Sequence, residues 1–478
     1  MVAPSGLNQN KQQRGGAKRA TPPGATDQTQ SRSAQADAAL GRAPEPHNTG
    51  PDNRALAGGT MPDRIIAFVM AGGQGSRLQP LTDARSKPSV PFGSRYRIVD
   101  FVLSNLVNSQ IQTIYLLVQY KSQSLIEHVR KAWTISPLLQ QQFVTVVPPQ
   151  MIADRWFQGT ADAVNQNLAL IEEHRPNLVV VFGADHIYRM DIRQMISFHR
   201  ERKADVTIAA LPVPLKDAQG FGVIAADAQG RIEAFEEKPA HPTPMPGNPD
   251  QAFASMGNYV FDTQVLVNAL REAQQLGETD FGGHVLPRLL RTHKLYAYDF
   301  ATNQIPGINP YEQRVYWRDV GTIDAYFDAH KDVLGGEPTF DMFNPQWPIF
   351  SSGYQGPVAR VLGGELRNTL LGAACVVHDG ARLYNSIIRR ETVIEEGAEI
   401  DDCIIMDYVR VCRGARLRKV IVDRHNVIEP GDTIGFDREA DERRGFTVSE
   451  GGITVMPAGR VGYFARANTD DGRGGYAE

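Results

Sequence analysis

Short apolar runs alternate with amphipathic segments along the first two thirds of the chain. Five continuously apolar runs predict strands buried on both faces, at residues 64–70, 113–118, 143–147, 178–182 and 206–211. Residues 98–110, 122–133 and 161–174 place their apolar side chains at helical spacing, which predicts helices between those strands. Strands that alternate with helices favour an α/β domain with a mostly parallel sheet and helices on both faces.

The last third of the chain has a different pattern, in which short apolar stretches recur with a turn glycine. Residues 379–388, 396–405 and 413–422 align without gaps. The turn glycines are seventeen residues apart: Gly380, Gly397, Gly414 and Gly431. A short repeat of this kind predicts the stacked coils of a parallel β-helix. Cys403 falls at the same repeat position as Ser386 and Val420, so we expect it to point into the core rather than to react.

The first sixty residues contain no Ile, Phe, Tyr or Trp and are rich in Gly, Pro, Gln and Ala. Such a segment buries too little apolar surface to offset its chain entropy, so we predict that residues 1–62 form a disordered extension. Its basic, acid-poor start weakly resembles an organelle transit peptide. A start codon assigned too early is a further alternative, because Met61 begins the folded-looking sequence.

Composition excludes several classes of protein. Hydrophobic residues make up 42% and charged residues 22% of the 478 residues, as in ordinary globular proteins. A formal net charge of -4 argues against a nucleic-acid partner, and no apolar run is long enough to predict a membrane span. Three irregularly spaced cysteines predict neither a disulfide framework nor a zinc site, which favours a cytoplasmic location.

A glycine-rich loop, "AGGQGSRLQPLT" at residues 71–82, directly follows the first predicted strand. It lacks the Gly-Lys-Ser/Thr ending of a Walker A loop, and Leu78 replaces the third glycine of the dinucleotide fingerprint. Gly72, Gly73 and Gly75 allow backbone N–H groups to approach an anion, and Arg77 offers a planar donor fork. With Lys87 nearby, the loop predicts a polyphosphate site, although a surface turn with solvated cations has the same local pattern.

Acidic residues follow two other apolar runs. Asp185 comes directly after the strand at 178–182 and is placed to hold Mg²⁺ beside phosphates. Asp319, in "YWRDVGT", suggests a second carboxylate for the metal, whereas Asp191 better suits a helix N-cap. Gly159 and Thr160 precede a predicted helix, where backbone donors can meet a ligand. Lys238, in "FEEKP", ends a strand and predicts either a second phosphate contact or an exposed turn.

Eight motifs together resemble a known family: "AGGQGSRLQPLT", "SKPSVPFGSRYRIVDFVLSNLVNS", "GTADAV", "FGADHIYRMD", "FGVI", "FEEKP", "SMGNYVF" and "YWRDVGTIDAY". They occur in the order found in bacterial-type glucose-1-phosphate adenylyltransferases. The resemblance implies a Rossmann-like nucleotidyltransferase domain at 63–335, a linker at 336–364, a left-handed parallel β-helix at 365–457 and a tail at 458–478. It also implies transfer of the adenylyl group of ATP to α-D-glucose 1-phosphate with Mg²⁺, toward glycogen or starch.

The resemblance assigns roles residue by residue. Gly72, Gly73, Gly75, Arg77 and Lys87 match the nucleotide-binding loop and its cations, with Gly159 and Thr160 beside them, and Arg77, Lys87 and Asp185 are the catalytic candidates. Asp185 and Asp319 match the metal carboxylates. The glucose-1-phosphate site is matched by Phe157, Gly222, Glu237, Lys238 and Ser255. The family also implies a homotetramer that responds to small-molecule allosteric effectors.

Two positions depart from the family pattern, and three alternatives stay open. Phe157 stands where the family usually has tyrosine, and Ala84 where some relatives carry an effector-linked lysine. The chain is alternatively a nucleotidyltransferase for another nucleotide or sugar phosphate. It is alternatively a non-catalytic regulatory subunit, although its phosphate cations and acids are present. An acyltransferase role for the β-helix would need a catalytic histidine such as His378 or His425.

Overall fold

The computed structural model describes residues 63–135, 142–150 and 155–459, and of Glu237 it describes the backbone only. The predicted disordered extension at 1–62 and most of the predicted tail at 458–478 lie outside these residues. The chain divides into two units, Met1–Met61 and Pro62–Glu478, and the following description concerns the second. Among the described residues, no helix is both long enough and apolar enough to cross a membrane.

Within the described part of the chain, nine strands form one mixed sheet. Seven of them follow the order β10-β9-β11-β6-β1-β4-β5, and β8 pairs with both β11 and β12. The strands are β1 (Ile65–Ala71), β4 (Thr113–Val118), β5 (Phe143–Val147), β6 (Leu178–Gly183), β8 (Val206–Pro214), β9 (Gly222–Ala226), β10 (Ile232–Glu237), β11 (Gln251–Asp262) and β12 (Leu295–Asp299). Shorter pairs are β2 (Pro91–Phe92) with β3 (Tyr96–Arg97), and β7 (His186–Tyr188) with β13 (Trp317–Asp319).

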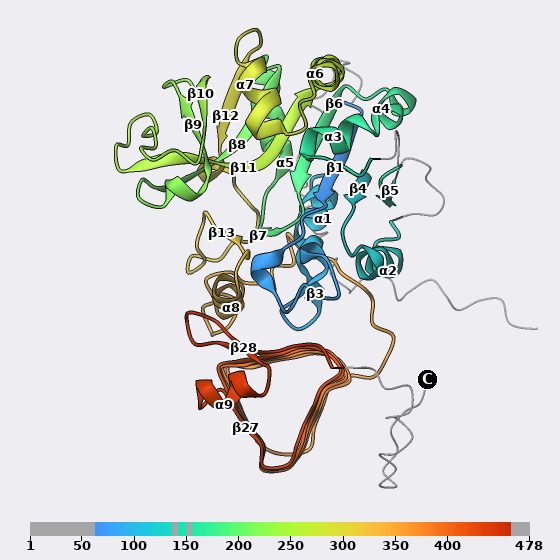
Figure 1. Ribbon diagram of the computed structural model, residues 1–478, viewed down its shortest axis with the longest axis vertical. Coiled ribbons are helices and arrows are strands. Elements are labelled where there is room, and N and C mark those ends of the chain that lie inside the picture. Colours follow the sequence, from blue (N-terminus) through green and yellow to red (C-terminus); the bar gives the residue numbers. More distant parts are fainter. Residues whose placement is uncertain (1–62, 136–141, 151–154, 460–478) are drawn as a thin grey trace, which may run out of the picture. The chain divides into compact units, whose positions relative to one another are not determined.

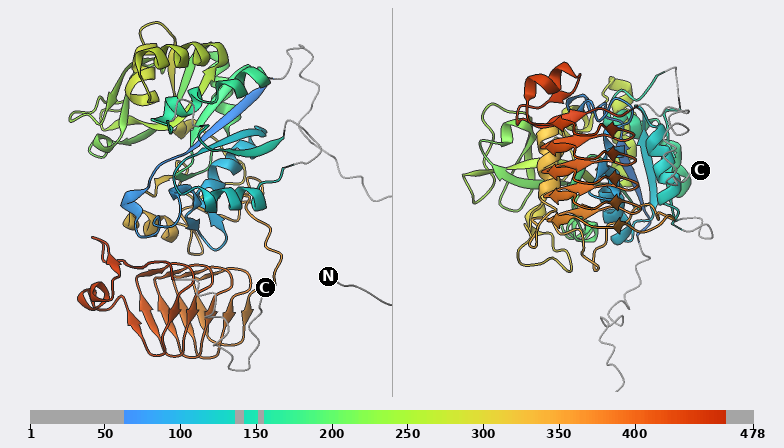
Figure 2. Two further views of the ribbon diagram at one scale, coloured as in Figure 1. Left: turned by 45° about the vertical axis from the view of Figure 1, so that its right-hand side comes forward. Right: turned by 90° about the horizontal axis from the view of Figure 1, so that it is seen from below.

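Helices cover both faces of this sheet, as Figures 1 and 2 show. The helices are α1 (Ile98–Asn108), α2 (Gln123–Ala132), α3 (Thr160–Asn165), α4 (Leu168–His174), α5 (Ile192–Glu201), α6 (Thr263–Leu276), α7 (Leu286–Leu289) and α8 (Ile323–Lys331). Along β1, Ala67 and Val69 pack with α1, α2 and α5, whereas Ile66 and Phe68 pack with α3, α4, α6 and α7. The prediction of an α/β sheet between two helical layers is therefore confirmed. Strands β1, β4, β5 and β6 pair in parallel, as do β8 and β12, whereas the pairings of β9, β10 and β11 are antiparallel.

Two local predictions were wrong. The predicted strand at 143–147 is not buried on both faces: β5 is an edge strand, and Thr145 is exposed. The predicted helix at 161–174 is two helices, α3 and α4, separated at Gln166 and Asn167. Asn167 Nδ2 donates to Ala163 O at 2.8 Å, so the side chain competes with the helical backbone bonding at this point.

Strand β11 bends beside the carboxyl ends of the parallel strands. One edge of β11 pairs with β8 at residues 251–255 and again at 259–261. The other edge pairs with β9 at residues 253–254 and with β6 at 259–262. The register shifts between Ser255 and Tyr259, where Gly257 has a φ of 69°. This irregularity turns the backbone of Met256 and Gly257 toward the end of the sheet at which parallel strands bind ligands.

The C-terminal region is a parallel β-helix, as the glycine repeat predicts. Figure 1 views its triangular coils nearly end on, and Figure 2 shows the strands stacked. One sheet holds β14 (Arg360–Val361), β17 (Val376–Val377), β20 (Val393–Ile394), β23 (Arg410–Val411) and β26 (Val427–Ile428). A second holds β15 (Glu365–Arg367), β18 (Arg382–Tyr384), β21 (Glu399–Asp401), β24 (Arg416–Arg418) and β27 (Thr433–Ile434). The third holds β16 (Leu370–Leu371), β19 (Ile387–Ile388), β22 (Ile404–Ile405), β25 (Val420–Val422), β29 (Thr454–Met456) and β28 (Thr447–Val448), with α9 (Arg438–Arg443) before the last pair.

Every corner of the coil uses left-handed backbone, not the glycine corner alone. Residues with positive φ recur at seventeen-residue spacing in three series: Gly380, Gly397, Gly414 and Gly431; Asn368, Asn385, Asp402 and Lys419; Ala374, Glu391, Tyr408 and His425. His425 stacks on Tyr408 with ring centroids 5.0 Å apart, so it has a structural place at a corner. Cys403 is buried in the coil interior as predicted, and burial raises the pKa of its thiol to about 12.

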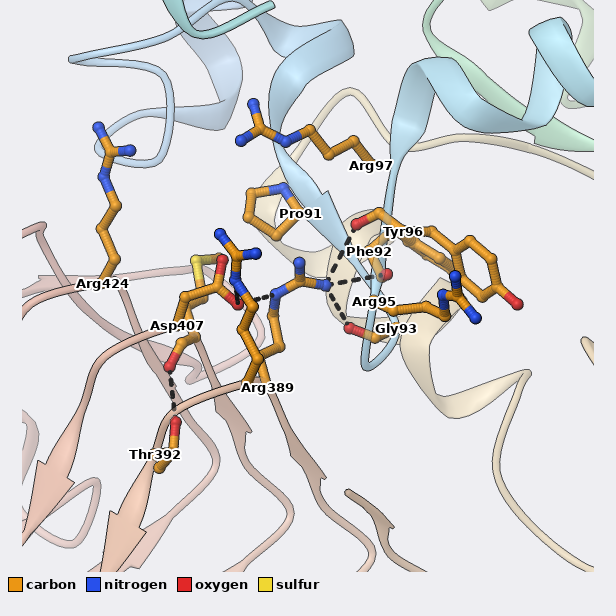
Figure 3. A network of polar contacts seen from close by, with 12 residues as sticks. Pro91, Phe92, Gly93, Arg95, Tyr96, Arg97, Arg389, Thr392, Asp407 and Arg424 are labelled. Atoms are coloured by element: carbon orange, nitrogen blue, oxygen red, sulfur yellow. Dashed lines mark hydrogen bonds and ion pairs between the residues drawn. The ribbon is translucent and has the colours of Figure 1, made fainter. Parts of the chain in front are cut away.

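A shared core joins the β-helix to the nucleotidyltransferase domain. Apolar side chains of both regions form one buried cluster, among them Leu78, Val320, Ile323, Phe327, Ile404, Ile421, Ile453 and Val455. Arg389, on the β-helix, donates to the carbonyls of Phe92, Gly93 and Tyr96 at 3.2, 2.7 and 3.1 Å (Figure 3). Its Nε donates to Asp407 at 3.0 Å. Buried polar groups need such partners, so these bonds specify one orientation of the β-helix.

Candidate active site

A cavity of about 570 Å³ opens at the carboxyl ends of β1, β4 and β6. Its lining brings together all the residues predicted to bind nucleotide, namely Gly72, Gly73, Gly75, Arg77, Lys87, Gly159 and Thr160. It also includes Asp185, a predicted metal carboxylate, and Phe157, a predicted glucose-1-phosphate residue. Other lining residues were not predicted, among them Gln119, His186, Met256, Gly257 and Tyr259. The position agrees with the general rule that α/β sheets bind ligands beyond the carboxyl ends of their strands.

The glycine-rich loop begins where β1 ends. Gly75 has a φ of 65° and starts the 3₁₀ turn Ser76–Leu78. A Cβ at Gly75 would lie 3.0 Å from the Lys87 Cβ, so both backbone conformation and packing require glycine. Leu78 is fully buried in the shared core, which anchors the far end of the loop. The exposed Arg77 between these anchors faces the cavity.

Lys87 lies between the two predicted metal carboxylates. Its Nζ donates to Asp185 Oδ2 at 3.1 Å and to Asp319 Oδ1 at 2.7 Å. The lysine side chain is buried, whereas both aspartates are partly exposed to the cavity. One ammonium group cannot neutralise two carboxylates, so the group keeps a net negative charge that favours a cation.

The β7–β13 ladder brings the two carboxylates together. Asp185 follows β6, and the adjoining His186 lies opposite Asp319 in the antiparallel pairing of β7 with β13. Ligand atoms of Asp185, His186 and Asp319 all lie within 4.8 Å of one another. Burial by itself raises the pKa of Asp185, but the charges of His186 and Lys87 outweigh it and lower the pKa to about 2. Asp185 is therefore ionised at neutral pH.

The donor chemistry of this group fits a divalent cation. Two carboxylates offer hard oxygen ligands, and the buried Nδ1 of His186 has no hydrogen-bond partner among the described residues. The residues present are thus sufficient to hold a metal ion.

Gly159 and Thr160 line the cavity, but the backbone amides that follow them are hydrogen-bonded to a neighbouring segment of the chain. The amides of Ala161 and Asp162 donate to Thr279 O at 2.9 and 3.0 Å. Thr160 Oγ1 donates to Asp280 Oδ2 at 2.9 Å. A Cβ at Gly159 would overlap the Thr279 carbonyl, so this glycine permits the close approach of the two segments. The amides of Ala161 and Asp162 are therefore occupied within the chain, and the role predicted for Gly159 and Thr160 stays a prediction.

The four predicted sugar-phosphate residues other than Phe157 lie at one end of the β9–β10 pair and beside it in the interior of β11. Gly222 pairs with Glu237, Lys238 N donates to Phe221 O at 3.1 Å, and Ser255 follows the residue paired with β9. None of these four is among the cavity-lining residues within the described ranges. The side chain of Glu237 lies outside what the structure describes.

Trp317 connects this group to the acidic group and was not singled out from sequence. Its ring centroid lies 4.7 Å from that of His186 and 5.9 Å from that of Phe221, which precedes Gly222. Its buried Nε1 has no hydrogen-bond partner among the described residues. Gln119, which follows β4, donates to Phe157 O at 3.2 Å, and its buried Oε1 also lacks a partner there. The local signal for Trp317 was an aromatic residue two positions before a predicted metal ligand, and that for Gln119 was its place directly after a predicted strand.

This fold and cavity define a nucleotidyltransferase that carries a C-terminal β-helix. The Nucleotidyl transferase family matches residues 66–336, and the family described as GlmU-like, C-terminal hexapeptide matches residues 359–456. Hexapeptide coils form the left-handed parallel β-helix that the resemblance implies.

Curated relatives narrow the class. The glucose-1-phosphate adenylyltransferase of Thermodesulfovibrio yellowstonii is 56% identical over 396 residues, covering 82% of this chain and 96% of the relative. Those of Corynebacterium jeikeium and Deinococcus radiodurans are 44% and 43% identical, and cover 82% and 84% of this chain and 97% and 100% of the relatives. The chain belongs to the glucose-1-phosphate adenylyltransferase family, which confirms the resemblance found in its motifs.

Proposed function

We propose that this chain transfers the adenylyl group of ATP to α-D-glucose 1-phosphate, giving ADP-glucose and pyrophosphate for α-1,4-glucan synthesis. One observation carries the proposal: Lys87 bridges Asp185 and Asp319 in a cavity bounded by the glycine-rich loop. Phosphate-binding backbone, cations and metal-competent carboxylates thus face one another, as the union of two polyanions requires.

The reaction needs no general base. A phosphate oxygen of glucose 1-phosphate attacks the α-phosphorus of ATP, and the bond from that phosphorus to the β-phosphate bridging oxygen breaks. The electron pair leaves with pyrophosphate. The attacking phosphate monoester has a second pKa of about 6 and is already mostly a dianion at neutral pH. The protein must hold the reactants in line and balance the charge that develops on the α-phosphate and pyrophosphate.

The loop and its cations supply the nucleotide contacts in this proposal. Gly72, Gly73 and Gly75 bring backbone N–H groups near the triphosphate, and Arg77 offers its donor fork. The positive charge of Lys87 offsets the negative charges of the two carboxylates and of the phosphates.

Mg²⁺ is the proposed cation, held by Asp185 and Asp319 with His186 beside them. When bound it supplies electrostatic stabilisation of the phosphate oxygens. The carboxylates also keep Lys87 in place, which orders the cationic side of the cavity.

Glucose 1-phosphate is proposed to bind where Gly222, Glu237, Lys238 and Ser255 gather, with Phe157 of the cavity lining as a further proposed contact. Support comes from the aromatic contacts of Trp317, which link Phe221 to the acidic group. Phe157 is buried and keeps the ring of the family's tyrosine without its hydroxyl.

The test is a pyrophosphate-release assay with ATP, glucose 1-phosphate and Mg²⁺. UTP, GTP and dTTP, and then other sugar phosphates, replace the substrates in turn. Turnover that is fastest with ATP and glucose 1-phosphate is expected. Faster turnover with another pair would identify a different sugar nucleotidyltransferase, and no turnover with any pair would favour the non-catalytic subunit.

Replacing Lys238 by alanine should raise the KM for glucose 1-phosphate about tenfold or more while the KM for ATP changes little. The reason is that the substitution removes one positive charge from the glucose-1-phosphate site and none from the ATP site. Initial rates measured against each substrate separate the two constants. Lys216→Ala is the matched control, because Lys216 is an exposed lysine on a nearby loop. A parallel rise in both KM values would show that Lys238 serves the nucleotide or the fold.

We also propose a homotetramer controlled by anionic small-molecule effectors. The first β-helix coil exposes Val358, Val361 and Leu362, an apolar end of the kind that subunit contacts cover. Arg97 lies near Arg389 at the β-helix interface (Figure 3), where burial and then the Arg389 charge lower its pKa to about 10. Such an excess of positive charge suits an anion.

Light scattering tests the proposed tetramer. Loss of the response to effectors in Arg97→Ala tests the proposed effector site.

The domain boundaries at residues 335 and 365 remain predictions. The first strand of the β-helix, β14, lies at Arg360–Val361, within the predicted linker.

A cytoplasmic location is likewise proposed, supported by three cysteines that are all buried as free thiols.

A further inference from the structure

A turn of the β-helix domain contacts the helix that follows the predicted metal ligand Asp319. Asp324 lies in the first turn of α8. Its Oδ1 accepts from Ser449 Oγ at 2.8 Å and from Gly451 N at 3.0 Å. Ser449 and Gly451 belong to the turn that joins β28 to β29, so the contact crosses from one domain to the other.

The geometry of this turn suits the carboxylate closely. A Cβ at Gly451 would overlap Asp324 Oδ1, so only glycine lets the backbone approach this near. Ser449 Oγ also accepts from Ile453 N at 3.1 Å, which fixes the hydroxyl that donates to Asp324. The turn itself is anchored, because β29 pairs with β25 and Ile453 and Val455 lie in the shared core.

The chain between Asp324 and Asp319 has little freedom to absorb movement. Val320 and Ile323 are buried in the shared core, and Thr322 caps α8 by accepting from Ala325 N at 3.2 Å. Between them, a Cβ at Gly321 would lie 3.1 Å from both Arg77 Nη2 and the Asp319 carboxylate oxygens. A displacement of the start of α8 therefore moves Asp319 together with Gly321, the residue that packs against Arg77.

A groove of about 950 Å³ runs along the same contact. Its lining includes Arg77, Asp324 and Gly451, and so it joins the cationic side of the active site to the β-helix turn. The link between the two domains is thus short and passes directly beside catalytic candidates.

We propose that the β28–β29 turn holds Asp324 and thereby positions Asp319, which makes Asp324 a positioning residue for adenylyl transfer. This inference rests on the proposed role of Asp319 as a metal carboxylate. Asp324 touches no reacting atom in this scheme. It sets where the second carboxylate stands relative to Asp185 and Lys87, and the β-helix acts as the support.

Asp324→Ala should raise the Mg²⁺ concentration for half-maximal rate by about three- to tenfold and should lower kcat. Removing a residue that orients a metal ligand typically weakens metal affinity by up to about a hundredfold. Asp324→Asn should restore most of both, because the amide oxygen accepts the same two hydrogen bonds. Asp328→Ala is the matched control: Asp328 lies one turn further along α8, is exposed and lines the same groove.

Hydrogen exchange supplies a readout that does not depend on turnover. The amides of residues 319–325 should exchange several-fold faster in Asp324→Ala than in the wild type, with Asp324→Asn and Asp328→Ala unchanged. Gly451→Ala should reproduce the Asp324→Ala effects, and the double variant should be no worse than either single one, because both changes break one contact.

Two results would overturn the proposal. One is an Asp324→Ala protein with a lower thermal midpoint but unchanged Mg²⁺ dependence and unchanged exchange at 319–325. The other is strictly additive effects of Asp324→Ala and Gly451→Ala. Asp319→Asn separates this failure from failure of the metal assignment: if that variant leaves the Mg²⁺ dependence unchanged, the metal role of Asp319 is wrong.

Discussion

At the scale of single residues, the Asp185 carboxylate is the clearest target. Asp185→Asn should lower kcat by at least about a hundredfold, because a neutral amide is a poor ligand for a hard cation and cannot balance its charge. The thermal midpoint should change little, since the side chain is partly open to the cavity. Steady-state rates and calorimetry measure both quantities. Asp83→Asn, at an exposed position outside the cavity lining, is the control and should keep its activity.

A second residue, His330, should make the protein sensitive to mild acid. His330 Nε2 accepts from Gly93 N at 3.1 Å, its Nδ1 bonds to Tyr326 O at 2.8 Å, and burial lowers its pKa to about 3. Below pH ~6.5 the unfolded chain binds a proton that the folded chain does not, so stability falls as pH falls and is level above that value. At pH 5 the loss should be about 2 kcal/mol.

Thermal midpoints measured from pH 8 to pH 5 test this expectation. His330→Gln keeps a donor and an acceptor but cannot titrate, so its midpoint should fall less steeply below pH ~6.5. The flattening should be partial, because burial also lowers the pKa of His199, to about 4. Identical slopes in the two proteins would mean that His330 binds its proton equally well in the folded and the unfolded state.

At the scale of elements, the β-helix corners separate backbone strain from packing. Gly414 has a φ of 67°, and no atom lies within 4 Å of a Cβ placed there. Gly414→Ala should therefore cost about 1 kcal/mol through backbone conformation alone. Urea unfolding measures the change. Gly336→Ala also enters open space, without a left-handed backbone, and should stay within about 0.5 kcal/mol of the wild type. Equal losses of stability in both variants would show that the left-handed backbone at Gly414 is not the cause of the cost.

At the scale of the whole molecule, one buried ion pair joins the two domains. Arg85 Nη2 donates to both Asp423 oxygens, at 2.7 and 2.6 Å, and the side chains are 2% and 1% exposed. Asp423→Ala leaves the guanidinium buried without its partner and should cost about 3 kcal/mol. The thermal midpoint is the measurement. Asp432→Ala breaks a more exposed pair with Arg444 inside the β-helix and should cost at most about 1 kcal/mol. A similar small loss in both variants would show that the interdomain pair contributes little.

Local sequence patterns determined the elements of this protein and part of its site. Continuous apolar runs, helical spacing and the seventeen-residue glycine repeat identified the α/β sheet and the β-helix. The glycine-rich loop and Asp185 were found because each directly follows a buried strand, and parallel strands end at one edge of the sheet. These signals are short range, so a single chain segment carries each of them in full.

Tertiary structure alone decided how distant segments meet. His186 and Trp317 join the acidic group because β7 pairs with β13, and no local pattern encodes that register. The edge position of β5, the bend in β11 and the contact of Asp324 with Ser449 likewise depend on partners far away in the chain. The physical reason is that strand pairing and buried hydrogen bonds depend on both partners. The hydrophobic periodicity of a segment reflects only how that one segment is buried.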